Sequence, residues 1–359
     1  MSNVSHTTIF LIGATGYIGG ALLTRLLAHP SAKTFDITVF LRSAEKAKLL
    51  ESNFGVKAVV GTLAELDKLE AQTAAAHVVF SCVSDMQADC DDVPAIEAIL
   101  RGHRKRHATT GDLPILIHTS GTGELTDNAK GLHTTDTIYN DLDPAQIETL
   151  PPTAIHRPVD LAIVRADAEG YVRTHIILPS VIYGIAGGPL VAAGISNPHS
   201  IAIPYLIRAS LDRRQAGMVG HGVSFWPVVH IDDVAGLYIV LYDAIVASPE
   251  NVGHGREGYY FGEAGETAWA DISRAIGVAL VELGISTTAE PTTFTTEELI
   301  KYFGSEMGNI MGSNSRCRGN RGRALGWKPV HTTADMIASI KPEIKALIAN
   351  PSYMAIVTN

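Results

Sequence analysis

The stretch Thr8-Ile9-Phe10-Leu11-Ile12-Gly13-Ala14-Thr15-Gly16-Tyr17-Ile18-Gly19-Gly20 decides the fold. Its apolar run ends in glycines and passes into residues 21–27, which have the apolar spacing of a helix. In a strand–turn–helix unit, Gly13 permits the tight turn, Gly16 lets the backbone approach a phosphate, and Gly19 lets helix and strand pack closely. The unpaired N–H groups and the dipole at the helix N-terminus favour an anion. We therefore predict a dinucleotide site, lined by Gly13, Thr15, Gly16, Tyr17, Ile18 and Gly19.

Length and composition are those of a globular chain with a sizeable core. The 359 residues suit one large or two closely joined domains, and 46% of them are hydrophobic. No run of about 18 uninterrupted apolar residues is present, and residues 1–6 do not begin a secretory signal. The three cysteines, Cys82, Cys90 and Cys317, suit reduced thiols. We expect a cytoplasmic protein that does not enter a membrane.

Charge narrows the range of partners. The net charge of −9 and the pI near 5.8 argue against nucleic acid or an anionic membrane surface as a partner. The basic run Arg101–His107 is interpreted as a solvated loop. His103 and His107 have the i,i+4 spacing of metal ligands, but the neighbouring cations would repel a metal, so we expect none. A small-molecule substrate is the expected partner, and a homodimer is possible.

Apolar strand-like runs alternate with helix-like segments through the first half of the chain. This alternation predicts an α/β fold, a Rossmann-type doubly wound parallel sheet with helices on both faces. The expected strands are 9–12, 37–41, 58–60, 78–83, 115–119 and 174–178. The expected helices are 19–27, 44–51, 63–75, 93–100 and 158–169.

After residue 184 the sequence becomes rich in glycine and proline. We assign residues 1–184 to an NAD(P)-binding Rossmann domain, to which residues 226–250 return. Residues 185–225 and 253–359 are assigned to a smaller C-terminal substrate lobe. Such a lobe would lie over the carboxyl edge of the sheet and close a cleft there.

The cofactor type is read at the end of the second strand. An acidic residue about 20 positions after the glycines would bind the adenosine ribose hydroxyls, but residues 38–43 contain no carboxylate. Arg42 could instead pair with a 2′-phosphate and Ser43 could add a hydrogen bond, so NADP is favoured over NAD. A solvated arginine is the alternative interpretation. The other wall of the cofactor site is expected at the strand ends, with Val83 and Ser84.

Two hydroxyls, those of Thr119 and Ser120, follow the predicted strand at 115–119. In doubly wound sheets the ligand lies outside the carboxyl ends of the strands, so these hydroxyls could orient a substrate carbonyl. Alternatively, they satisfy backbone groups at a turn.

Several motifs, in order along nearly the whole chain, resemble those of the extended short-chain dehydrogenase/reductase family, which includes epimerases and dehydratases. They are Gly13–Gly19, Thr119-Ser120, Leu178–Gly184, Val229–Val234 and Arg323–Pro329. The resemblance implies a Rossmann domain with a C-terminal substrate lobe. It also implies that Ser120 orients the substrate and that Pro179 to Val181 pass beside the nicotinamide.

The chain departs from this family at the acid/base pair. The family has Tyr-x-x-x-Lys on the helix before the Leu178-Pro179 strand, and here His156 and Asp160 hold those positions. An imidazole with an ordinary pKa near 6.5 needs no neighbouring cation to exchange a proton near neutral pH. Asp160, one helical turn on, could orient it, so His156 and Asp160 are candidate catalytic residues. The alternative is that both serve only the helix start. Arg157, between them, is interpreted as a surface arginine.

Three functions are consistent with these residues. The first is an NADP-dependent oxidoreductase that acts on a carbonyl or alcohol of a small organic molecule, with His156, Asp160, Ser120 and Thr119 at its centre. The second is an NAD(P)-binding sensor without catalysis, which the missing Tyr-Lys pair favours. The third is a redox-neutral epimerase or dehydratase that acts on a nucleotide sugar.

Overall fold

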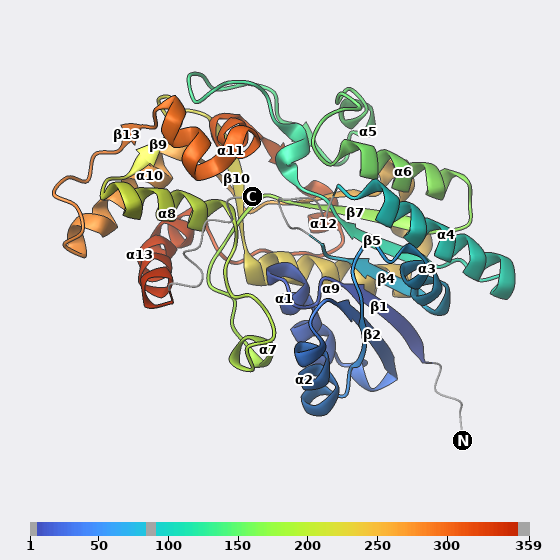
Figure 1. The fold of residues 1–359 in the computed structure, drawn as a ribbon. Coiled ribbons are helices and arrows are strands. Elements are labelled where there is room, and N and C mark those ends of the chain that lie inside the picture. Colours follow the sequence, from blue (N-terminus) through green and yellow to red (C-terminus); the bar gives the residue numbers. More distant parts are fainter. Residues whose placement is uncertain (1–5, 84–90, 351–359) are drawn as a thin grey trace.

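The computed structural model describes residues 6–83 and 91–350. Its centre is a seven-stranded parallel sheet (Figure 1). In spatial order the strands are β11 (Tyr259–Gly262), β7 (Arg173–Pro179), β5 (Ile115–Thr119), β4 (Val78–Ser81), β1 (Thr7–Ile12), β2 (Phe35–Leu41) and β3 (Lys57–Val60). The chain thus runs outward from β1 in one direction and then in the other. This reversal between β1 and β4 is the switch point where doubly wound sheets bind ligands.

Helices cover both faces of the sheet because its strands are apolar on both sides. Ile9 and Leu11 of β1 face one apolar core, and Phe10 and Ile12 face the other. On the first side lie α1 (Tyr17–Leu27), α2 (Ala44–Phe54) and α9 (Ile231–Ala247). On the second lie α3 (Leu66–Ala75), α4 (Val93–Thr110) and α6 (Arg157–Ala168). The Rossmann-type fold predicted from the sequence is confirmed.

The basic run Arg101–His107 is not a loop. It lies inside α4, which continues to Thr110 and ends at Gly111 in the left-handed conformation. His103 is fully buried in this helix, while Arg104 extends over the ring of Tyr171. The apolar spacing stops at residue 100, so the pattern missed the part of the helix whose outer face is charged.

A second body of structure is built mainly from later residues, and it has its own apolar core. Its main helices, grouped on one side in Figure 1, are α8 (Ala202–Arg213), α10 (Trp269–Glu282), α11 (Thr296–Gly312) and α13 (Thr333–Ala349). A three-stranded sheet joins them to the Rossmann domain; its strands are β8 (Val181–Tyr183), β10 (Phe225–His230) and β12 (Glu266–Ala268). The remaining short elements are α5 (Pro144–Ile147), α7 (Pro189–Ala192), α12 (Asn320–Ala324), β6 (Tyr139–Asn140), β9 (Gly217–Met218), β13 (Thr292–Thr293) and β14 (Cys317–Arg318).

Two boundaries differ from the sequence prediction. Strand β11, assigned from the sequence to the C-terminal lobe, is the edge strand of the large sheet and pairs with β7. Within residues 226–250, α9 returns to the Rossmann domain and packs on α1, but β10 pairs with β8 and β12 instead. Pairing between distant strands decides both placements, and local periodicity carries no information about it.

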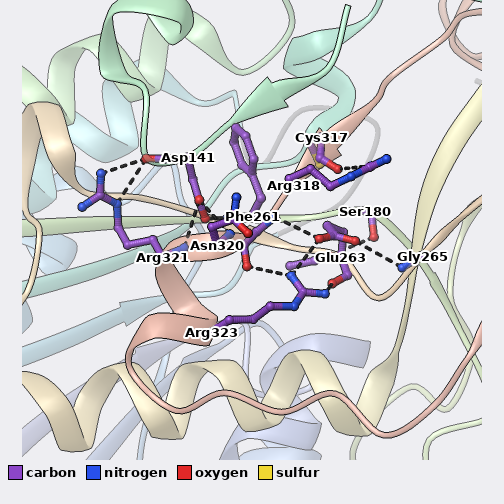
Figure 2. Close-up of polar contacts among 12 residues, drawn as sticks. Asp141, Ser180, Phe261, Glu263, Gly265, Cys317, Arg318, Asn320, Arg321 and Arg323 are labelled. Carbon is purple, nitrogen blue, oxygen red and sulfur yellow. Dashed lines mark hydrogen bonds and ion pairs between the residues drawn. The ribbon is translucent and has the colours of Figure 1, made fainter. Parts of the chain in front are cut away.

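Buried carboxylates hold the C-terminal segment against the edge of the large sheet (Figure 2). Asp141 accepts hydrogen bonds from the backbone N–H groups of Phe261, Asn320 and Arg321 at 2.9–3.1 Å. Glu263 accepts from the Gly319 N–H at 2.9 Å and from the Arg323 guanidinium at 2.7 Å. These contacts place α12 beside β11 and so close one end of the sheet.

Candidate active site

The glycine turn between β1 and α1 leaves no room for side chains at two of its positions. Gly13 has a φ of +86°, and a Cβ there would lie 2.5 Å from the Cys82 carbonyl oxygen. A Cβ on Gly19 would lie 2.2 Å from the Gly13 carbonyl oxygen. Gly16 closes the turn through its N–H, which donates to Gly13 O at 2.9 Å. The turn is therefore restricted to glycine by close backbone approach, as the sequence predicts.

The first turn of α1 contributes no competing anion. Its N-cap is Gly16, which offers no side chain, and the first turn contains no acidic residue. The N–H groups at this end are thus left to an external acceptor, and the helix dipole favours a negative one. These residues fit the pyrophosphate of a dinucleotide.

Three predicted cofactor residues of this turn are tied to the protein itself. The Tyr17 hydroxyl donates a hydrogen bond to the Gly184 carbonyl, and Ile18 is buried in the core. The Thr15 carbonyl accepts from the Asn197 N–H at 3.0 Å, so the segment after β8 lies against the turn. The side chains of Tyr17 and Ile18 hold the turn in place, and only their backbone remains for a phosphate.

Arg42 and Ser43 follow β2 and differ in what they contact. Arg42 is exposed at the carboxyl end of the strand. Ser43 is the N-cap of α2, and its hydroxyl accepts from the Lys46 N–H at 3.2 Å. The Ser43 hydroxyl thus has a structural role, and the role of Arg42 toward a cofactor stays a prediction.

The remaining predicted cofactor residues lie at the carboxyl ends of neighbouring strands. Val83 follows β4 and is half-buried, and Ser84 lies outside the described residues. Pro179 ends β7 and Val181 begins β8; both are buried. Between them, the Ser180 hydroxyl donates to the Gly262 carbonyl at 2.8 Å. Their role toward a nicotinamide stays a prediction.

Thr119 and Ser120 are adjacent in the chain but their hydroxyls have different partners. The Thr119 hydroxyl is buried and lies 2.6 Å from the hydroxyl of Tyr238 on α9. The Ser120 hydroxyl donates to Oδ2 of Asp160 on α6 at 2.7 Å. Of the two predicted hydroxyls, Ser120 therefore joins the acid/base candidates, and Thr119 packs into the core.

His156 is the N-cap residue of α6 and has a strained backbone, with a φ of +70°. Non-glycine residues in this left-handed region concentrate at functional sites. Its Nδ1 lies 2.9 Å from Oδ1 of Asp91. Its Nε2 lies against the turn after β5, because a Cβ on Gly121 would be 3.0 Å away and one on Gly123 3.3 Å away.

The carboxylate that orients His156 is therefore Asp91, and the sequence interpretation that gives this task to Asp160 is wrong. Asp91 directly precedes the N-cap of α4, and His156 is the N-cap of α6. Helices that connect parallel strands run antiparallel to them, so both N-termini lie at the carboxyl edge of the sheet. Asp160 is fully buried and is engaged by Ser120.

Two further charged residues, Glu124 and Arg157, complete this centre. Arg157 is 4% exposed, not a surface arginine; its Nη1 donates to Glu124 Oε1 at 3.1 Å and to the Tyr259 hydroxyl at 2.9 Å. Glu124 lies in the short 3-10 helix Thr122–Leu125. No sequence signal marked Glu124, since a lone carboxylate after a glycine turn is usually exposed.

Burial changes the ionisation of these groups. Burial, and then the neighbouring Glu124 carboxylate, raise the pKa of Asp160 well above its usual range. Burial also raises the pKa of Glu124, but Arg157 opposes that shift. The pKa of His118, buried on β5, is lowered to about 3, chiefly by burial, so its ring is neutral near pH 7.

One cluster in the described part of the chain has the residue types of a metal site: His230, Asp232 and His331. His230 Nδ1 accepts from the Asp232 N–H at 3.2 Å, and His331 Nδ1 lies 3.0 Å from Asp233 Oδ2. Arg25 also donates to the Asp232 carbonyl at 2.7 Å. These contacts anchor the start of α9 to the C-terminal segment.

Among the described residues, no helix is long and apolar enough to cross a membrane.

Known proteins resemble this chain in sequence. A family model described as NAD(P)H-binding matches residues 13–126. The oxidase ucsJ of Acremonium sp. is 30% identical over 340 residues, which cover 90% of this chain and 92% of the relative.

Solved structures of low sequence identity share the fold. dTDP-glucose 4,6-dehydratase from Bacillus anthracis, solved in complex with NAD, aligns with a TM-score of 0.65 at 15% identity, covering 97% of this chain and 98% of its own. UDP-glucose 4-epimerase from Thermotoga maritima, solved with UDP-glucose, aligns with a TM-score of 0.62 at 13% identity, covering 96% and 100%.

Proposed function

Because the chain belongs to the extended short-chain dehydrogenase/reductase family, we propose that it is an NADP-dependent oxidoreductase that acts on a carbonyl or alcohol group of a small organic molecule. The observation that carries this proposal is the His156–Asp91 pair. The imidazole of His156, on a backbone with a φ of +70° and held by a carboxylate at 2.9 Å, lies at the carboxyl edge of the sheet beside the turn that follows Ser120. This is the arrangement of a positioned acid/base group.

Each group of residues would have its own task in this reaction. The glycine turn and the N-terminus of α1 would hold the pyrophosphate, and Arg42 would pair with the 2′-phosphate that distinguishes NADP from NAD. A nicotinamide bound here would supply or accept the hydride. His156 Nε2 gives a proton to the substrate oxygen, or takes one from it, in step with that transfer. Asp91 holds the imidazole in one tautomer and stabilises its cationic form. Ser120 positions the substrate oxygen.

The first experiment measures binding of NADPH, NADP⁺, NADH and NAD⁺ to the purified protein by calorimetry. The second follows NADPH consumption with a panel of aldehydes and ketones, and NADP⁺ reduction with the matching alcohols. His156→Ala is expected to reduce turnover at least about a hundredfold while leaving cofactor affinity unchanged. His221→Ala, which removes an exposed imidazole in the C-terminal lobe, is the control.

Two results would redirect the proposal. Tight NADPH binding with no turnover on any substrate would favour the sensor function. Conversion of a nucleotide sugar without net cofactor reduction would favour the epimerase or dehydratase function. Unchanged turnover in His156→Ala would exclude the acid/base role of this residue.

A further inference from the structure

Two carboxyl groups and one guanidinium are sealed together beneath the candidate active site. Glu124 is 1% exposed, Asp160 0% and Arg157 4%. Arg157 donates to Glu124 Oε1 at 3.1 Å, and Ser120 donates to Asp160 Oδ2 at 2.7 Å. The other oxygen of each carboxyl group, Glu124 Oε2 and Asp160 Oδ1, receives no donor from the described residues.

The carboxyl groups of Glu124 and Asp160 are close enough to interact, and the charge of Glu124 raises the pKa of Asp160. Two ionised carboxylates beside each other repel, so the state in which both are charged is disfavoured. A single buried guanidinium also balances only one negative charge, and a second buried carboxylate would be left uncompensated. The pair therefore holds one proton.

The surroundings place that proton on Asp160. Glu124 faces the Arg157 guanidinium, which stabilises the ionised form of Glu124. Asp160 receives a neutral O–H from Ser120, and burial and the Glu124 charge both raise its pKa. The acidic proton points to the Glu124 carboxylate because that acceptor is charged and the Ser120 oxygen is not.

Other titratable groups around the pair agree with this state. The ones that face it are His118 on β5, His156 on α6, Tyr259 on β11 and, behind His156, Asp91 before α4. His118 Nε2 lies 4.0 Å from Asp160 Oδ1, but the low pKa of His118 keeps its ring neutral. Burial and the nearby carboxyl groups hold the pKa of Tyr259 above its usual range.

We infer that Asp160 works as a neutral carboxylic acid that fixes the Ser120 hydroxyl as a hydrogen-bond acceptor toward the substrate, so that the group received beside Ser120 is an alcohol. Ser120 has one proton and gives it to Asp160. Its lone pairs then suit a substrate O–H and cannot bind a carbonyl oxygen. Asp160 is thus a positioning residue.

This inference deepens the proposed function and rests on it in one respect only, the identity of the ligand beside Ser120. It implies that the site, before substrate binds, is arranged for oxidation of an alcohol. In the resting complex the substrate hydroxyl donates to Ser120; for oxidation its O–H turns to His156 and loses the proton there, while the hydride of the C–H bond would pass to NADP⁺. The ketone product has no donor for Ser120 and is held less tightly. The alcohol form of a ligand is expected to bind about fivefold tighter than its ketone form.

The protonation state is tested on the protein alone, by infrared difference spectra between wild type and Asp160→Asn at pH 7. A protonated-carboxyl band present in wild type and absent in the variant is expected. Asparagine offers an N–H donor to Glu124 in place of the carboxylic O–H and keeps an acceptor oxygen for Ser120, so Asp160→Asn should unfold within about two degrees of wild type. Glu124→Gln leaves Arg157 without a buried counterion and should unfold at a clearly lower temperature. Absence of the band, or equal destabilisation by both variants, overturns the inference.

The positioning role is tested on the best alcohol substrate from the turnover panel. Asp160→Asn should keep the wild-type KM, whereas Asp160→Leu frees the Ser120 proton and should raise the KM for the alcohol several-fold more than it changes kcat. An unchanged KM in Asp160→Leu contradicts the role of Asp160. Failure of the protein to bind NADPH would instead overturn the proposed function and leave the infrared result standing.

Discussion

His156 and Asp91 are joined by a 2.9 Å hydrogen bond across 65 residues of sequence, from the N-cap of one helix to the residue before the N-cap of another. The contact brings two helix N-termini together at the edge of the sheet where a nicotinamide is expected.

Asp91→Asn is expected to lower kcat about a hundredfold, because an amide neither fixes the tautomer of His156 nor stabilises its cationic form. The matched control is Asp92→Asn. Asp92 caps α4 through the Ala95 N–H at 2.8 Å, and asparagine caps a helix equally well. Steady-state kinetics on the best substrate measures both variants. Equal activity in the two would show that Asp91 has no part in proton transfer.

Gly121→Ala should reduce activity without reducing stability. Gly121 has an extended backbone, with a φ of −167°, so alanine is allowed there. Its methyl group would lie 3.0 Å from His156 Nε2 and would displace the imidazole. Gly236→Ala, in the middle of α9 with open space around the new methyl, should keep activity and add about 0.5–1 kcal/mol of stability. Normal activity of Gly121→Ala would place the working position of the imidazole elsewhere.

Arg42→Ala is expected to weaken NADPH binding at least about tenfold and to leave NADH binding unchanged, since only NADPH carries the 2′-phosphate. Lys48→Ala removes the same charge from an exposed position on α2 and serves as the control. Calorimetric titration of the two cofactors measures the ratio. A parallel loss for both cofactors would mean that Arg42 acts only through long-range charge.

His103→Leu should reduce the loss of folding stability that occurs as the pH falls below neutral. Burial lowers the pKa of His103 to about 3. Between an unfolded-state value near 6.5 and pH 3, the unfolded chain binds a proton that the folded chain does not, so stability falls as the pH falls. The variant should gain about 2 kcal/mol relative to wild type on going from pH 7.5 to pH 5.

Urea unfolding at the two pH values measures this gain. The exposed His221→Leu should show no such gain, and the groups common to all three proteins cancel in the comparison. A wild-type slope in His103→Leu would mean that His103 is already protonated in the folded chain.

Local patterns predicted the elements that depend on local physics. Alternation of apolar runs located the strands of the Rossmann domain to within a few residues, and the glycine turn is restricted by contacts among residues 13–19 and their neighbours. Helix α4 ran past its predicted end because its last two turns are mostly polar on the outside. Strand β11 was misplaced because the identity of a strand's partner is not a local property.

The candidate site divides in the same way. The sequence marks His156, Asp160 and Ser120 as candidates because they hold positions of a sequence motif. The sequence carried no signal for Glu124, and it predicted Arg157 to be exposed. The burial of both depends on β5, α6 and β11 meeting at one point.

The sequence by itself determined the glycine turn, whose close backbone contacts leave no room for side chains, and the order of strands and helices. It also determined that a histidine and an aspartate stand where the related family has tyrosine and lysine. Only the tertiary structure decided the partners of those two residues. Asp91 pairs with His156 because parallel strands bring helix N-termini to one edge. Asp160 lies beside Ser120 and Glu124, where the absence of water raises its pKa. Charge pairing and desolvation depend on distances in space, and separation along the chain does not set them.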